Sequence, residues 1–114
     1  MATIYHNPRC GKSREALKIL HERGENVTIV EYLKKCPDAD TLKGILAKLG
    51  IPAQDLVRKN EKIYKDQYKG KELSEEEWVE AMVENPILIE RPIVIKDQKA
   101  VIGRPKEKLD EILS

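Results

Sequence analysis

One cysteine lies in the polar stretch YHNPRCGKSRE, which spans residues 5–15. Cys10 follows a segment typical of a β-strand and directly precedes one typical of an α-helix. A thiolate in this position faces unpaired N–H groups and the positive end of the helix dipole, which lower its pKa and make it nucleophilic. Free cysteines also pack as small buried hydrophobes, but this neighbourhood is cationic. The residues expected to add positive charge around Cys10 are His6, Arg9, Lys12 and Arg14.

Spacing excludes two other chemistries for this stretch. The letters GKS end the phosphate-binding pattern GxxxxGK[ST], but the position of its first glycine holds His6. Pro8 also lacks the N–H group that such a loop would offer to a phosphate. Small cysteine phosphatases need an arginine where this chain has Ala16. A redox role for Cys10 therefore fits best.

The residue three positions after Cys10 indicates how a redox cycle would be completed. In a CxxC pair the second thiol resolves a mixed disulfide, whereas here that position holds Ser13. The resolving sulfur is then either Cys36, which follows the next predicted strand, or a thiol of another molecule. Cys36 could equally be an incidental loop cysteine, so both routes stay open.

Apolar periodicity and turn residues predict the elements that position Cys10. Strands are predicted at 2–6 and 26–32, with a helix at 12–23 between them. Residues 60–73 are ambiguous. The other predicted elements are helices at 38–49, 53–59 and 74–84, a hairpin made of a strand region at 86–95, a turn at 96–99 and a return strand at 100–104, and a closing helix at 105–113.

Local signals mark the ends of several predicted helices. Gly24 and Gly50 are expected to stop the first and second helices. Pro52 fits the first turn of the third helix. Ser74, with Glu77 three residues later, is expected to form a capping box at the start of the helix that carries Trp78.

The order of the predicted elements gives the fold class. A βαβ unit implies two parallel strands with a right-handed crossover, and the terminal hairpin adds an antiparallel pair. This predicts an α/β protein. The order matches that of a thioredoxin-like fold with a helical insertion between its two halves, but periodicity by itself does not choose this fold. We therefore predict a single domain over residues 1–114, with the insertion at about 38–84; this length can bury one core without metals or disulfides.

Composition narrows the function classes. Hydrophobic residues make up 40% of the 114 residues, charged residues make up 36%, and 21 Lys and Arg nearly balance 20 Asp and Glu. Nucleic-acid binding normally needs a basic excess, so it is not expected. No membrane span, secretory signal or zinc site is expected either. A cytoplasmic location with two reduced thiols is predicted.

Four motifs together resemble the ArsC family of glutaredoxin-coupled arsenate reductases. They are YHNPRCGKSR at 5–14, LVRKNE at 56–61, NPILIERPIVI at 85–95 and GRP at 103–105. They follow the family's order, and the resemblance covers residues 3–113.

The resemblance implies a role for each matching residue. Cys10 would be the nucleophile, and Pro92 would be the cis-proline that faces the active cysteine in thioredoxin-like folds. His6 would help to hold Cys10 as a thiolate, and Asn7 and Ser13 would support its loop by hydrogen bonds. The arginines that would hold the oxyanion are Arg58, Arg91 and Arg104, since guanidinium groups bind tetrahedral anions through paired hydrogen bonds.

The resemblance also implies the reaction partners. Cys10 would attack arsenate to form a cysteinyl–arsenate adduct, which glutathione would reduce, and glutaredoxin would regenerate the enzyme. No bound cofactor or metal is expected, and a monomer is predicted. Two alternatives stay open. One is a regulator related to the Spx proteins, which bind RNA polymerase but typically carry a CxxC switch; the other is a glutathione-linked thiol reductase with another substrate.

Overall fold

The structure, a computed structural model, describes residues 2–103 and 106–113. The chain divides into two compact units, which are described separately below. The first unit combines Met1–Lys35 with Arg91–Ser114, and the second unit is Cys36–Glu90. The prediction of a single domain over 1–114 stays a prediction.

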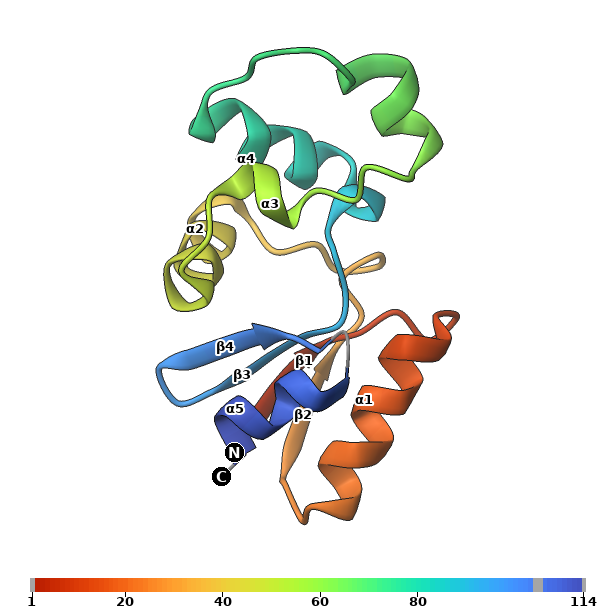
Figure 1. Cartoon of the computed structure of the whole chain (residues 1–114), viewed down its shortest axis with the longest axis vertical. Coiled ribbons are helices and arrows are strands. Elements are labelled where there is room, and N and C mark those ends of the chain that lie inside the picture. The colour runs from red at the N-terminus through yellow and green to blue at the C-terminus, as the bar shows by residue number, and fades with distance from the viewer. Residues whose placement is uncertain (1, 104–105, 114) are drawn as a thin grey trace. The chain divides into compact units, whose positions relative to one another are not determined.

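The first unit is built on a four-stranded sheet (Figure 1). Its strands are β1 (Ala2–Tyr5), β2 (Val27–Val30), β3 (Ile93–Lys96) and β4 (Lys99–Ile102), in the order β2-β1-β3-β4. Strand β1 runs parallel to β2 and antiparallel to β3, and β3 pairs with β4 as a hairpin. This confirms the predicted parallel pair and terminal hairpin, and the arrangement is that of a thioredoxin-like fold.

The helices of this unit pack on the sheet through a small apolar core. Helix α1 (Gly11–Glu22) and the closing 3₁₀ and α-helical turns η3 (Lys106–Leu109) and α5 (Asp110–Leu113) supply its helical side. The buried members of this core are Ile4, Ala16, Leu20, Val94, Leu109 and Ile112. Because these residues come from β1, α1, β3, η3 and α5, burying them fixes the start of α1, and hence Cys10, against the sheet.

Gly103 follows β4 and packs against Pro92, the residue after Arg91. Its N–H donates to the Pro92 carbonyl at 2.8 Å. A Cβ atom added at Gly103 would lie 3.2 Å from the Pro92 ring and 3.6 Å from the Cβ of Ala16 in α1. We expect Gly103→Ala to lower the free energy of unfolding by about 1–3 kcal/mol, because a packed core resists added volume.

Urea unfolding of Gly103→Ala would measure this loss, and Gly44→Ala is its matched control. Gly44 lies inside a helix of the second unit, and a Cβ added there would meet nothing within 4 Å. The control substitution should stabilise its helix by up to about 1 kcal/mol. Equal stability of Gly103→Ala and the parent protein would contradict the close packing of Gly103 on Pro92.

The second unit is helical. It contains α2 (Ala39–Leu49), α3 (Ala53–Leu56), the π-helical turn η1 (Tyr64–Tyr68), α4 (Glu75–Glu84) and the 3₁₀ turn η2 (Pro86–Leu88). Helix α4 contacts α2, α3 and η2. Trp78 of α4 is buried, as predicted, and stacks on Tyr64 with ring centroids 6.3 Å apart. The region at 60–73, which is ambiguous from sequence, thus supplies Tyr64 and Tyr68 to an aromatic cluster with Trp78.

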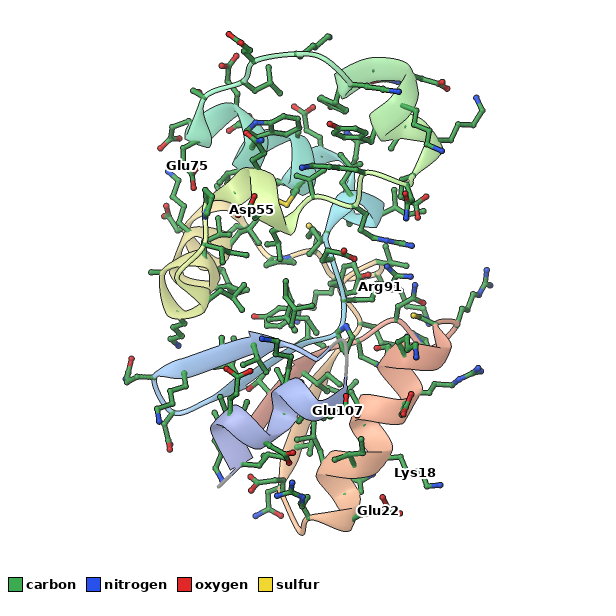
Figure 2. The ribbon with its side chains drawn as sticks, viewed as in Figure 1. Lys18, Glu22, Asp55, Glu75, Arg91 and Glu107 are labelled. Atoms are coloured by element: carbon green, nitrogen blue, oxygen red, sulfur yellow. The ribbon has the colours of Figure 1, made fainter. Side chains whose placement is uncertain are left out.

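Two predicted helix ends of this unit are confirmed, the stop at Gly50 and the capping box at Ser74. Asp38 caps α2 by accepting the Thr41 N–H at 2.8 Å, and Gly50 ends it in the left-handed conformation with φ 71°. Ser74 and Glu77 form the reciprocal capping box. Glu75, marked in Figure 2 at the start of α4, accepts the N–H of Ala53 at 2.9 Å and so joins α3 to α4.

Several predicted elements are shorter than expected; the strand predicted at 26–32, for example, covers only Val27–Val30. The helix predicted at 53–59 ends at Leu56, because Val57 is extended and pairs with Ile89 across an antiparallel bridge. The strand region predicted at 86–95 begins instead with the 3₁₀ turn, and its regular strand starts only at Ile93. In the part of the chain that the structure describes, no helix is long and apolar enough to cross a membrane.

Candidate active site

Cys10 occupies the N-cap position of α1, at the end of the loop that leaves β1. Its backbone is extended, with φ −94° and ψ 123°. Its N–H donates to the Asn7 carbonyl at 3.0 Å, and its carbonyl accepts the N–H of Arg14 at 3.0 Å. The half-buried thiol is therefore held at the amino end of a twelve-residue helix, where the unpaired N–H groups of the first turn lie.

Several groups act on the pKa of Cys10. Partial burial of the thiol opposes ionisation, but the backbone N–H groups of Ser13 and Lys12 and the guanidinium of Arg91 favour the thiolate more strongly. The net result is a lowered pKa. The sulfur makes no full capping hydrogen bond to the helix, so the two N–H groups act as nearby dipoles. Cys10 is thus poised as a nucleophile.

Arg91 is the arginine that the structure places at Cys10. It is buried, with 9% of its surface exposed, and it precedes β3 (Figure 2). Its guanidinium affects the thiol both by charge and by a side-chain hydrogen bond. The Arg91–Pro92 peptide bond is cis, as the resemblance implied. A buried guanidinium beside a thiolate is suited to hold a small oxyanion against the nucleophile.

The other two predicted arginines lie outside the described part of the first unit. Arg58 belongs to the second unit, where its N–H donates to the Leu88 carbonyl at 2.7 Å. Its guanidinium lies 2.6 Å from a Glu61 carboxylate oxygen and 3.7 Å from one of Glu90. Arg104 lies outside the described residues. An oxyanion-binding role for Arg58 and Arg104 therefore stays a prediction.

Ser13 joins His6 and Asn7 beneath the loop. Its fully buried hydroxyl lies 2.6 Å from Nδ1 of His6 and accepts the N–H of Asn7 at 3.0 Å. With one lone pair occupied, the hydroxyl can donate its proton to an unprotonated Nδ1. The Asn7 side chain in turn accepts the N–H of Arg9 at 3.0 Å. These bonds link both ends of the loop, so they support the position of Cys10.

The expectation that His6 adds positive charge is wrong. Burial lowers the pKa of His6, Glu31 opposes this, and Arg14 lowers the pKa further, for a net downward shift. The imidazole is therefore neutral near pH 7 and contributes a hydrogen bond instead of a charge. Its contact with Ser13 joins it to the loop that carries Cys10, and a role in holding Cys10 as a thiolate stays a prediction.

Removing the Ser13 hydroxyl should destabilise the loop. Ser13→Ala leaves the N–H of Asn7 and Nδ1 of His6 without their buried partner, and one such loss costs about 1–3 kcal/mol. Chemical denaturation would measure this cost. Ser13→Thr keeps the hydroxyl and serves as the comparison. An unchanged free energy of unfolding in Ser13→Ala would contradict the role of the buried hydroxyl.

Glu31 is a neighbour of the site that sequence reasoning missed. It follows β2, and Tyr5 of β1 pairs in register with Val30 of β2. Parallel strands end at the same edge of a sheet, so Glu31 meets His6 there and raises its pKa. The sequence could have placed Glu31 near His6, because the two residues follow parallel strands that need only be assumed to end together.

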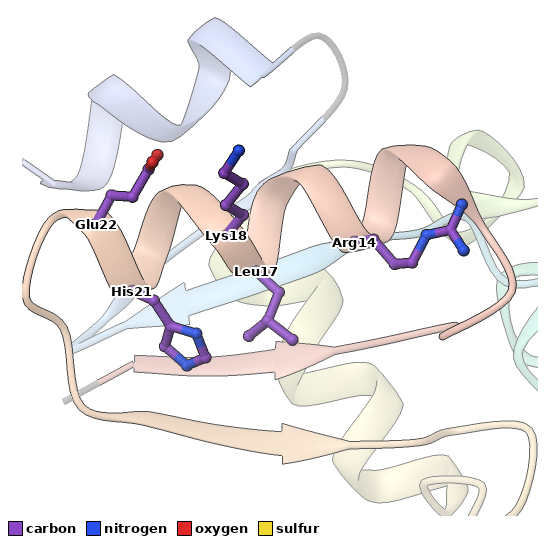
Figure 3. Close-up of a pocket in the computed structure, with 5 residues that line it drawn as sticks. All are labelled: Arg14, Leu17, Lys18, His21 and Glu22. Carbon is purple, nitrogen blue, oxygen red and sulfur yellow. The ribbon is translucent and has the colours of Figure 1, made fainter.

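A hollow also lies on the outer face of α1 (Figure 3). It has a volume of about 480 Å³ and is lined by Arg14, Leu17, Lys18, His21 and Glu22. It begins one helical turn beyond Cys10 and contains no residue of the loop from His6 to Cys10.

The chain is similar to known proteins over nearly its whole length. The family model described as "ArsC family" matches residues 5–112. The chain is 49% identical to the Escherichia coli protein named "Uncharacterized protein YfgD", over 96% of this chain and 94% of that protein. It is 44% identical to "Arsenate reductase" of Haemophilus influenzae, over 96% and 97% of the two chains. The structure of "Arsenate reductase from Vibrio cholerae" superposes with a TM-score of 0.93 at 40% identity, covering 97% of this chain and 96% of that one.

Proposed function

Since the chain belongs to the ArsC family, we propose that it is an arsenate reductase that takes its electrons from glutathione. The observation that carries the proposal is the pairing of Cys10, with its lowered pKa, and the buried guanidinium of Arg91. Relatives named arsenate reductase support the choice of substrate. The expected compartment is the cytoplasm, where thiols stay reduced.

Arg91 would bind two arsenate oxygens and neutralise part of their charge. Such neutralisation is needed because the attacking thiolate and the substrate are both anions. The N–H groups at the start of α1 would add to it. Arg58 and Arg104 are proposed to complete the anion site; for Arg58, this means exchanging a carboxylate partner for an arsenate oxygen.

The first chemical step forms a bond between Cys10 and arsenic. The Cys10 thiolate attacks arsenic(V), and one arsenate oxygen, after taking up protons, leaves as water. This step is a substitution and transfers no electrons. The product is a cysteinyl–arsenate adduct in which arsenic is still pentavalent.

The second step transfers the electrons. The glutathione thiol loses its proton and attacks the Cys10 sulfur, and the electron pair of the sulfur–arsenic bond goes to arsenic, which leaves as arsenite. Cys10 and glutathione become a mixed disulfide, so two thiols are oxidised while arsenic(V) is reduced to arsenic(III). Glutaredoxin would then remove the glutathionyl group. Ser13, buried where a CxxC motif has its second cysteine, supports an external thiol.

A coupled assay tests this proposal. Purified protein, glutathione, glutaredoxin and arsenate should yield arsenite, and omitting either thiol component should stop turnover. If no arsenite forms while Cys10 still reacts readily with an alkylating probe, the arsenate assignment fails and only a thiol role survives.

A further inference from the structure

Resting on this proposed function, we propose that a cleft beside the Cys10 loop binds the γ-glutamyl arm of glutathione. The cleft has a volume of about 230 Å³. One wall is the loop from His6 to Arg9, and the other carries Glu31, Leu33 and Lys34. All of these residues belong to the first unit.

One backbone hydrogen bond joins the two walls at the edge of the sheet, and others shape each wall. The His6 N–H donates to the Val30 carbonyl at 2.8 Å, where β1 and β2 end together. The Lys34 N–H donates to the Glu31 carbonyl at 2.9 Å, so this wall is a closed turn. The Asn7 carbonyl holds the N–H of Cys10. The cleft is therefore formed before a ligand arrives, and one wall is tied directly to the nucleophile.

The side chains of the cleft match the chemistry of a γ-glutamyl group. This group ends in a carboxylate and an ammonium on one carbon, at the end of a short methylene stem. Lys34 and Arg9 can receive the carboxylate, and Glu31, whose carboxylate lies 3.5 Å from the Lys34 ammonium, can receive the ligand's ammonium. Leu33, exposed over 43% of its surface, and Pro8 offer apolar contacts to the stem.

The volume of the cleft sets how much of the ligand it holds. Pockets that enclose a whole drug-sized ligand measure about 300–1,000 Å³, so this cleft accommodates one arm of the tripeptide. The cysteinyl sulfur then stays outside the cleft, whose loop wall ends one residue before Cys10. The hollow on α1 (Figure 3) is larger and also cationic, but it shares no residue with this loop.

Thiol–disulfide exchange tests the cleft without arsenate. The Cys10 thiolate attacks one sulfur of oxidised glutathione, forms a mixed disulfide and releases one glutathione thiolate. Mass spectrometry would measure the rate at which the mixed disulfide forms. This rate is divided by the rate with the neutral bis(2-hydroxyethyl) disulfide, and the ratio corrects for any change in Cys10 itself. Lys34→Glu should lower this ratio about fivefold, because it replaces an attraction for the ligand carboxylate by a repulsion.

Two other charge reversals are the matched controls. Lys35→Glu makes the same change in charge at the next, exposed residue, which does not line the cleft, and Lys18→Glu makes it in the α1 hollow. Both should keep the ratio near that of the parent protein. Three results would each overturn the inference. They are an unchanged ratio in Lys34→Glu, an equal fall of the ratio in Lys34→Glu and Lys35→Glu, and a fall in Lys18→Glu alone.

The disulfide of cysteinylglycine identifies the arm that is bound. It keeps the glycyl carboxylate but lacks the γ-glutamyl group, so Lys34→Glu should not change its relative rate. A fall as large as that for oxidised glutathione would overturn the assignment of the γ-glutamyl arm. Because arsenate is absent from these reactions, a failure to form arsenite would overturn the proposed function while leaving this result intact.

Discussion

Replacing Arg91 by alanine should raise the pKa of Cys10 and nearly abolish arsenate reduction. The guanidinium lowers that pKa by charge and by a hydrogen bond. Without it, the inflection in a plot of alkylation rate against pH moves to higher pH, and below the inflection each unit of pKa reduces the thiolate fraction about tenfold. Loss of an anion-binding group adds a fall in kcat/KM of about a hundredfold or more.

Arg91→Lys is the informative control, because it keeps a positive charge but loses the paired donors. We expect it to retain part of the shift in the Cys10 pKa and to reduce arsenate little better than alanine does. Iodoacetamide labelling across pH and the coupled assay provide the two measurements. Since Arg91 is buried, circular dichroism must first show that both variants fold. An unmoved inflection in a folded Arg91→Ala protein would remove Arg91 from the account of Cys10 reactivity.

Cys10→Ser should lower arsenate reduction by about a thousandfold or more, since a serine hydroxyl is neither ionised near pH 7 nor able to form a disulfide. Cys36→Ser should keep the activity of the parent protein. Burial raises the pKa of Cys36, and its thiol donates to the Pro37 carbonyl at 3.3 Å. Cys36 is therefore a protonated thiol with a structural partner at neutral pH.

The pair of cysteine variants also decides between the two routes of resolution left open by the sequence. If an external thiol resolves the adduct, only Cys10→Ser loses activity in the coupled assay. Mass spectrometry of the parent protein after one turnover should then show glutathione bound at Cys10. A Cys36→Ser protein as inactive as Cys10→Ser, or a disulfide between Cys10 and Cys36, would instead support internal resolution.

Elements with local signals could be predicted from the sequence. The capping box at Ser74 and the glycine stop at Gly50 involve residues within one helical turn, so the sequence alone specifies them. The helix expected over 53–59 failed beyond Leu56 because a distant partner, Ile89, pairs with Val57. Such a tertiary contact overrides helical periodicity and leaves no mark in the local pattern.

Some features of the candidate site follow from local sequence patterns, and others depend on contacts with distant residues. The position of Cys10 at the start of a helix follows from the order of strand and helix signals. The neutrality of His6 depends on its burial, which local pattern does not reveal. Arg91 could be linked to Cys10 only through the family resemblance, because the two residues are far apart in the chain. Arg58 has two carboxylate partners. Glu61 is local, three residues further along the chain, whereas Glu90 is distant in sequence and follows Ile89, the bridge partner of Val57.

The first unit is assembled from two stretches of chain separated by the whole of the second. A ribosome adding about 5–20 residues per second therefore delivers β1, Cys10 and α1 well before Arg91, β3 and β4. During that interval the nascent chain carries its cysteine without the guanidinium that favours the thiolate. In the finished unit this guanidinium joins the N–H groups of Ser13 and Lys12, so the lowering of the Cys10 pKa is complete only when the sheet is complete.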